Sequence, residues 1–231
     1  MEISKEATTG MKAIAVFMVI ASHLGFGFGV NGVGIFLLLS GFGLSKSYGE
    51  EIDAKRFLLR RAGKLLPLFF VFISLQFIIF GGDLWDMLFF QHTWFVPYIL
   101  FWYLAYLACS GKMKWLLAIA IMLILMRPIY PPELFRWFIW ALCFPLGVWM
   151  AREKRDLLGM ETGIYIGIIT WSLIIGWALQ DLPHYPITAT MAAVGLVGLL
   201  YKARHLLENN AIVWIGRRSC GIYLFHVWFL P

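Results

Sequence analysis

The first hydrophobic segment of the chain, residues 11–28, reads MKAIAVFMVIASHLGFGF. It contains His23, and a membrane helix does not normally carry an ionisable side chain unless that group is used. Lys12 stands eleven residues earlier, which is three helical turns with about 20° of drift, so both side chains are expected on one helix face, about 16 Å apart along the axis. We predict a buried base within the membrane and a cation at its rim. The alternative is a histidine that forms a hydrogen bond between packed helices.

Hydrophobic residues make up 61% of the 231 residues, and the chain holds 11 Trp and 20 Phe. A soluble core of this size cannot bury so many apolar side chains. We therefore expect an all-α fold, a polytopic transmembrane helix bundle with eight complete spans plus a partial ninth, across a hydrocarbon layer about 30 Å thick. The eight expected spans are residues 11–28, 32–44, 65–80, 94–108, 115–129, 135–151, 163–179 and 187–201, and the partial ninth is residues 220–231.

The basic residues predict the orientation of these spans. If the N-terminus is cytoplasmic, 17 of the 19 Lys and Arg residues fall on the inner side, and only Arg127 and Arg136 fall on the outer side. This asymmetry follows the positive-inside rule. The net charge of +6 therefore indicates topology and no nucleic-acid partner. Without a linker, a low-complexity tract or a repeat, residues 1–231 are interpreted as a single membrane domain.

The longest inner connection, residues 45–64, carries a concentrated basic stripe. On a helix Arg56, Arg60 and Lys64 follow one another at four-residue intervals, with Arg61 beside them. Two interpretations stay open. The stripe is either an interfacial helix attracted to anionic lipid or a phosphate-binding surface for a nucleotide-bearing donor.

The outer side offers a different group of side chains, His92, Trp94 and Tyr98. Trp and Tyr at a membrane face usually form an aromatic belt. The same rings suit the faces of sugars, so this segment is also a candidate for an acceptor site. His226 is a second intramembrane histidine, but it ranks below His23 because its span is incomplete. The three cysteines show neither CxxC nor Cys/His ligand spacing, so no metal is expected.

Five stretches, taken in order, carry a resemblance to a known family. They are residues 10–15 leading to Ser22-His23, residues 34–42, residues 57–67, residues 94–98 and residues 215–226. Together they make the chain similar to the acyltransferase-3 family of integral membrane acyltransferases. The resemblance implies a bundle of usually ten spans in the inner (plasma) membrane of bacteria. It also implies transfer of an acyl group, commonly acetyl from acetyl-CoA, to an extracytoplasmic acceptor such as a surface polysaccharide, with His23 as a catalytic residue.

The chain departs from the family pattern at three places. Lys12 stands where the family usually has arginine, and Lys64 likewise replaces an arginine of the basic pattern. Lysine keeps the charge but loses the planar fork that binds an anion through two hydrogen bonds. The third departure is the early end at Pro231, from which we expect either a shortened version of a longer family member or a last segment sheltered inside the bundle.

Acyl transfer from a thioester to a hydroxyl requires a base for the hydroxyl proton, and neutral imidazole suits that task near pH 7. We therefore assign His23 as the general base, Lys12 as an electrostatic or positioning partner, and Arg56, Arg60, Arg61 and Lys64 to the phosphates of the donor. The competing class is a non-enzymatic membrane transporter or flippase-like component for a lipid-linked glycan, with His23 as a proton relay or packing group. Transporters often show paired broken helices, and the sequence contains no such pair.

Overall fold

The computed structural model of the chain describes residues 3–26, 31–48, 52–83, 87, 93–126, 129, 135–152, 159–178 and 185–228. All regular structure in these ranges is helical and none is strand, so the all-α fold class is confirmed for this part of the chain. The longer helices are α1 Lys5–His23, α2 Asn31–Tyr48, α3 Ala54–Phe80, α5 Phe95–Ala108, α6 Met113–Met126, α9 Thr162–Ala178 and α10 Tyr185–Lys202. The shorter ones are α7 Phe135–Ile139, α8 Cys143–Arg152, α11 Arg204–Leu207, α12 Asn210–Arg217, α13 Ser219–Phe225 and the 3₁₀ turn η4 His226–Trp228.

Helix α2 forms the centre of the bundle and is buried on nearly all sides between residues 32 and 45. Its most extensive partner is α8. A Cβ atom at Gly41 would lie 2.2 Å from the carbonyl oxygen of Phe144, and one at Gly147 would lie 2.0 Å from that of Leu38. Glycine at both positions therefore lets the two backbones approach closely, which is how membrane helices pack without a strong hydrophobic driving force between them.

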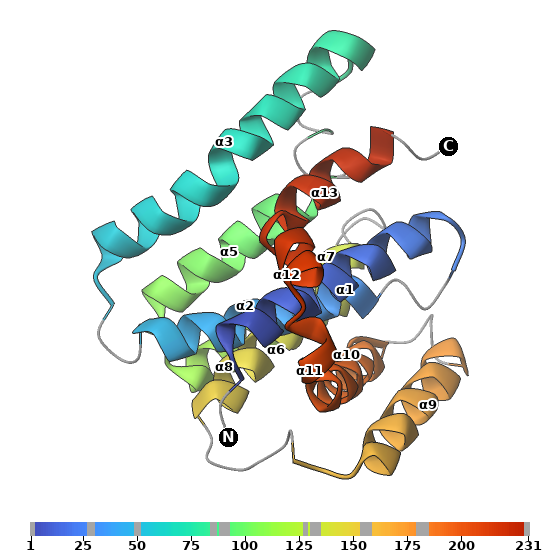
Figure 1. Cartoon of the computed structure of the whole chain (residues 1–231). Helices are drawn as coiled ribbons and strands as arrows, with labels where there is room; N and C mark the ends of the chain where they lie inside the picture. The colour runs from blue at the N-terminus through green and yellow to red at the C-terminus, as the bar shows by residue number, and fades with distance from the viewer. Residues whose placement is uncertain are drawn as a thin grey trace.

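Helix α1 packs on α2, and the C-terminal helices α11, α12 and α13 also lie against it (Figure 1). Ser4 caps its first turn, because the Ser4 hydroxyl accepts a hydrogen bond of 2.9 Å from the Ala7 amide. The helix ends at His23, beyond which the Leu24 amide bonds back to the carbonyl groups of Ile20 and Ala21. The first and last parts of the chain are thus packed together.

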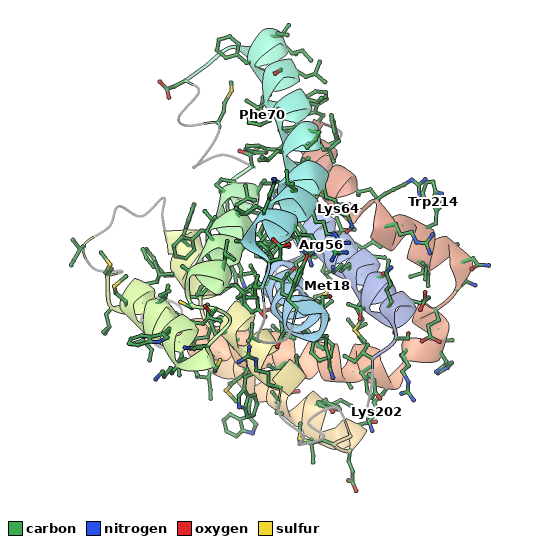
Figure 2. The ribbon with its side chains drawn as sticks, turned by 90° about the vertical axis from the view of Figure 1, so that its left-hand side faces the viewer. Met18, Arg56, Lys64, Phe70, Lys202 and Trp214 are labelled. Atoms are coloured by element: carbon green, nitrogen blue, oxygen red, sulfur yellow. The ribbon has the colours of Figure 1, made fainter. Side chains whose placement is uncertain are left out.

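Helix α3 runs along one edge of the molecule and extends beyond the other helices (Figure 1). Only five of its 27 residues are buried. Phe70 is 57% exposed and Ile78 is 76% exposed, and Phe70 marks the extending part of the helix in Figure 2. Such an apolar surface suits a lipid environment.

The structure corrects the predicted connection at residues 45–64. Helix α2 continues to Tyr48 and α3 already begins at Ala54, so the basic residues belong to the first turns of the long helix α3. The cause is local. The Asp53 carboxylate accepts a hydrogen bond of 3.0 Å from the Arg56 amide and caps the helix, which begins eleven residues before the predicted start of this span.

Two further segments differ from the prediction. The expected span at residues 135–151 is divided into α7 and α8 by a turn in which the Cys143 amide bonds to the Trp140 carbonyl. Pro145 has no amide hydrogen and is tolerated only in the first turn of a helix, so a new helix begins just before it. The expected inner loop after α10 contains two short helices, α11 and α12.

The count of eight spans stays a prediction. Among the described residues one helix, α3, is both long enough and apolar enough to cross a bilayer by itself. The shorter apolar helical stretches are Phe95–Ala108, Met113–Met126, Trp137–Arg152, Thr162–Ile175 and Pro186–Lys202. The last segment is represented by the seven residues of α13 and by η4, which are too short for a crossing.

Candidate active site

Helix α1 carries the two residues that the sequence singled out, Lys12 and His23. Lys12 lies in the second turn of the helix and is partly buried. His23 is the last residue of the helix and its side chain is exposed, whereas the sequence predicted a buried base within the span. The helix ends there because the chain turns at Leu24 and continues through Gly25 with a φ of 92°, a left-handed conformation that glycine favours. His23 is therefore open to approach from outside the bundle.

Two cations lie around Lys12. The charged groups that act on Lys12 in the folded chain are Arg61 and Lys64, both from α3. We call Lys12, Arg61 and Lys64 the basic cluster. No carboxylate of the described residues pairs with any of the three. Like charges that gather without a counterion leave a local positive potential, which favours an anionic ligand.

Arg61 is held at the cluster by aromatic rings. Its guanidinium carbon lies 5.6 Å from the ring centroid of Tyr103 and 6.0 Å from that of Tyr48, at the distance of cation–π contacts. Tyr103 is buried and its hydroxyl shares a hydrogen bond with Ser40 of α2. The Nε atom of Arg61 is buried and has no hydrogen-bond partner among the described residues. Arg61 is therefore oriented by ring contacts, and a donor group remains available to an incoming anion.

The structure separates the four basic residues that the sequence grouped on α3. Arg61 turns toward α5, while Arg56 and Arg60 are exposed. Neighbouring residues on a helix point about 100° apart, so Arg60 and Arg61 cannot share a face. Figure 2 shows Arg56 and Lys64 on the part of α3 that lies beside the other helices. Only Arg61 and Lys64 are brought together with Lys12.

At the other end of α1, His23 meets a second histidine. The ring centroids of His23 and His226 lie 4.9 Å apart with the rings tilted by 59°. His226 is buried at 6% exposure, and its Nδ1 atom bonds to the backbone carbonyl of Tyr223. The sequence ranked His226 below His23. In the sequence, His226 is visible only as a second histidine at the end of an apolar segment. The packing of α13 on α1 is what shows that His226 and His23 meet.

The residues predicted to bind the acceptor lie elsewhere. Trp94 and Tyr98 are buried at 6% and 0% exposure. Trp94 stacks on Trp140 with centroids 5.6 Å apart, and the centroid of Tyr98 lies 5.0 Å from that of Trp137. Both rings thus pack between helices, and their role toward an acceptor stays a prediction. His92 lies outside the described residues.

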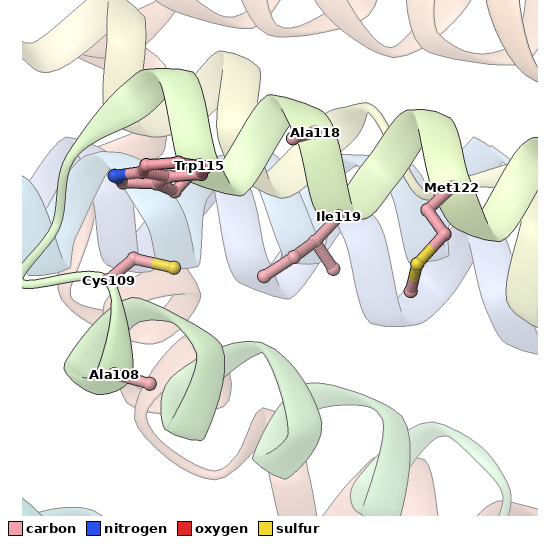
Figure 3. Close-up of a pocket in the computed structure, with 6 residues that line it drawn as sticks. All are labelled: Ala108, Cys109, Trp115, Ala118, Ile119 and Met122. Atoms are coloured by element: carbon pink, nitrogen blue, oxygen red, sulfur yellow. The ribbon is translucent and has the colours of Figure 1, made fainter.

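A cavity of about 360 Å³ opens between the end of α5 and helix α6 (Figure 3). It is lined by Ala108, Cys109, Trp115, Ala118, Ile119 and Met122. No predicted site residue lines it, and apart from the Cys109 thiol its walls are mostly apolar. Among the described residues, no three His, Cys, Asp or Glu side chains gather where they could hold a metal ion.

Comparison with known proteins gives one match. The family model described as an acyltransferase domain, that of the acyltransferase-3 family, matches residues 7–231. No curated protein and no solved structure matches the chain. The match includes Lys12 and His23 of α1, the basic residues of α3 and His226.

Proposed function

The chain belongs to the acyltransferase-3 family and is a membrane acyltransferase, and we propose that it moves an acyl group, acetyl in the simplest case, from acyl-CoA to a hydroxyl of an extracytoplasmic glycan. The observation that carries this proposal is the arrangement along α1. Lys12, in the N-terminal half of the helix, lies in the basic cluster, and the C-terminal end presents an exposed histidine.

The basic cluster is the proposed site of the CoA phosphates. Arg61 contributes a planar guanidinium, which suits phosphate oxygens, and Lys12 and Lys64 contribute point charges. The absence of a paired carboxylate among the described residues supports this role, because three gathered cations gain from a ligand with several negative charges. Arg56 and Arg60 are exposed and better placed to meet anionic lipid headgroups.

His23 is the proposed general base. The pantetheine arm of CoA separates its phosphates from its thioester, so a donor bound at the basic cluster can extend along α1 toward His23, about 16 Å away. His23 takes the proton of the acceptor hydroxyl as the hydroxyl oxygen bonds to the acyl carbon. The carbon–sulfur bond breaks with its electrons on sulfur. The proton then passes from His23 to the thiolate, which leaves as CoA.

The proposed topology gives each end of α1 its substrate. With the N-terminus in the cytoplasm of a bacterial inner membrane, the basic cluster faces the compartment that holds acyl-CoA. His23 then faces the side of the glycan. The excess of Lys and Arg in the connections on one side supports this orientation.

The experiment is turnover by purified protein in lipid nanodiscs. Acetyl-CoA and a panel of surface glycans are added, and free CoA and acylated glycan are quantified by mass spectrometry. We expect CoA release that depends on the acceptor and acylated product in equal amount. Binding of a lipid-linked glycan without any release of CoA would overturn the proposal in favour of a transporter. His205→Ala is the matched control for His23→Ala, because His205 is an exposed histidine on α11 outside the site.

A further inference from the structure

The contact between His23 and His226 joins an exposed ring to a buried one. His23 ends α1 and is exposed, while His226 begins η4 and is 6% exposed. The ring centroids lie 4.9 Å apart, so the two imidazoles are in contact, and among the described residues no hydrogen bond is made to the Nε2 atom of His226. Of the two, only His23 is accessible to a substrate, so the rings are not interchangeable in function.

The backbone fixes the protonation pattern of His226. Its Nδ1 atom bonds to the carbonyl oxygen of Tyr223, and a carbonyl oxygen only accepts. Nδ1 must therefore carry the hydrogen, and in the neutral ring Nε2 is then the acceptor. A buried histidine held in this tautomer can receive a hydrogen bond from an N–H group of a neighbouring imidazole.

Aromatic packing holds His226 in place. The flanking Phe225 and Trp228 rings lie 5.2 and 5.3 Å from the ring of Phe72 on α3, by centroid distance. Tyr223 contacts Phe95 of α5 at 5.1 Å. The turn that carries His226 is thus clamped between two helices other than α1. Such clamping keeps the position of the His226 ring independent of movements of His23.

We propose that His226 is a positioning residue for His23, a role that rests on the proposed function. In the proposed arrangement the exposed His23 ring rotates so that one of its N–H groups donates to the Nε2 atom of His226, a hydrogen bond that this structure does not contain. This bond fixes the tautomer of His23 and turns its other ring nitrogen, with its lone pair, toward the acceptor hydroxyl. A backbone carbonyl thus holds a buried histidine, and the buried histidine orients the exposed base. In catalytic triads a third residue orients the base in the same way.

The alternative is a histidine that only packs. It would need the volume of the ring and not its nitrogen atoms. His226→Phe keeps an aromatic ring and removes both nitrogens, whereas His226→Gln keeps one donor and one acceptor on a side chain of similar length. His205→Phe serves as the matched control on an exposed histidine.

The first measurement separates kcat from KM for acetyl-CoA and for the glycan. In His226→Phe we expect kcat to fall about tenfold to hundredfold, the range for hydrogen-bond partners that orient a functional histidine, while both KM values stay within about twofold. His226→Gln should recover part of the loss. Equal kcat values in His226→Phe and the wild-type protein would overturn the positioning role. A fall in kcat in His226→Gln as large as that in His226→Phe would overturn it as well.

The second measurement is a double-mutant cycle with His23→Ala. If His226 acts through His23, the double variant His23→Ala/His226→Phe should have nearly the same kcat as His23→Ala. We expect a further fall in kcat of less than about twofold. Additive losses would overturn the positioning role and leave His23 as the base. A wild-type protein without acyl transfer would overturn the proposed function and this inference together, so the two failures are distinguishable.

A third measurement observes the protonation of His226 in the wild-type protein. In the wild-type protein labelled with ¹⁵N-histidine, the His226 ring should show the neutral form with hydrogen on Nδ1, assigned by the signals that His226→Gln removes. A His226 ring with hydrogen on Nε2 and none on Nδ1 would overturn the proposed hydrogen-bond order.

Discussion

The two ends of α1 differ in the kind of group that meets them. Around Lys12 the neighbours are fixed cations from α3, and around His23 the neighbour is a second imidazole from η4. A guanidinium keeps its charge across the physiological pH range, whereas imidazole gains and loses a proton within it. The fixed cations that bind an anionic donor and the imidazole that can move a proton thus lie at different places along one helix. Among the substitutions that test activity, the larger effects are therefore expected for His23 and the smaller ones for the basic cluster.

Membrane orientation offers the largest, all-or-none contrast. In a background without the three native cysteines, a cysteine at Asp83 follows the end of α3 and one at Lys55 lies at its start. The positive-inside rule places position 83 outside and position 55 inside. An impermeant maleimide added to whole cells should label the first and spare the second. The reverse pattern would place the basic cluster on the outer side and break the comparison between the two ends of α1.

The next largest effect is expected from His23→Ala. Loss of a general base typically costs about a hundredfold to ten-thousandfold in rate. The exposed position of His23 means that its removal leaves no cavity in the core, so the bundle should stay folded. Acyl transfer is measured on protein that is monodisperse in detergent. Near-normal turnover would show that the base is another group and would leave the His23 end without its proposed role.

The basic cluster is tested by two adjacent arginines. Arg61→Gln removes the guanidinium that packs on Tyr103, and Arg60→Gln removes the exposed neighbour as a matched control. A lost charge-assisted hydrogen bond to phosphate should raise the KM for acetyl-CoA about tenfold in Arg61→Gln, with kcat little changed, because such a contact is made equally in the ground and transition states. Equal KM values in the two variants would contradict a donor site at the cluster.

The smallest effect is expected from Lys12→Arg, which restores the residue usual in the family. The charge is kept and a second hydrogen bond to an anion becomes possible. We expect the KM for acetyl-CoA to stay the same or fall by less than about threefold. Lys12→Gln, in which the charge is lost, should raise it. A strong loss in Lys12→Arg would mean that the space beside Arg61 and Lys64 is shaped for the smaller ammonium group.

Much of the local structure follows from nearby sequence. Apolar stretches indicate the longer helices, and Asp53 begins α3 because its carboxylate caps the Arg56 amide. The break before α8 follows from Pro145. The short helices α11 and α12 were not predicted, because their segments are brief, and they form where they pack on α1.

The sequence by itself determined the helical class, the family and the placement of Lys12 and His23 on one helix, because composition, ordered motifs and the helical period depend only on residues close along the chain. The tertiary structure decided which distant groups share a site. It divided Arg60 from Arg61 by the face of α3 that packs on α5, and it carried His226 from the end of the chain to His23. Such contacts depend on how helices cross, and helix crossing is set by the packing of many side chains and glycines that no single stretch of sequence contains.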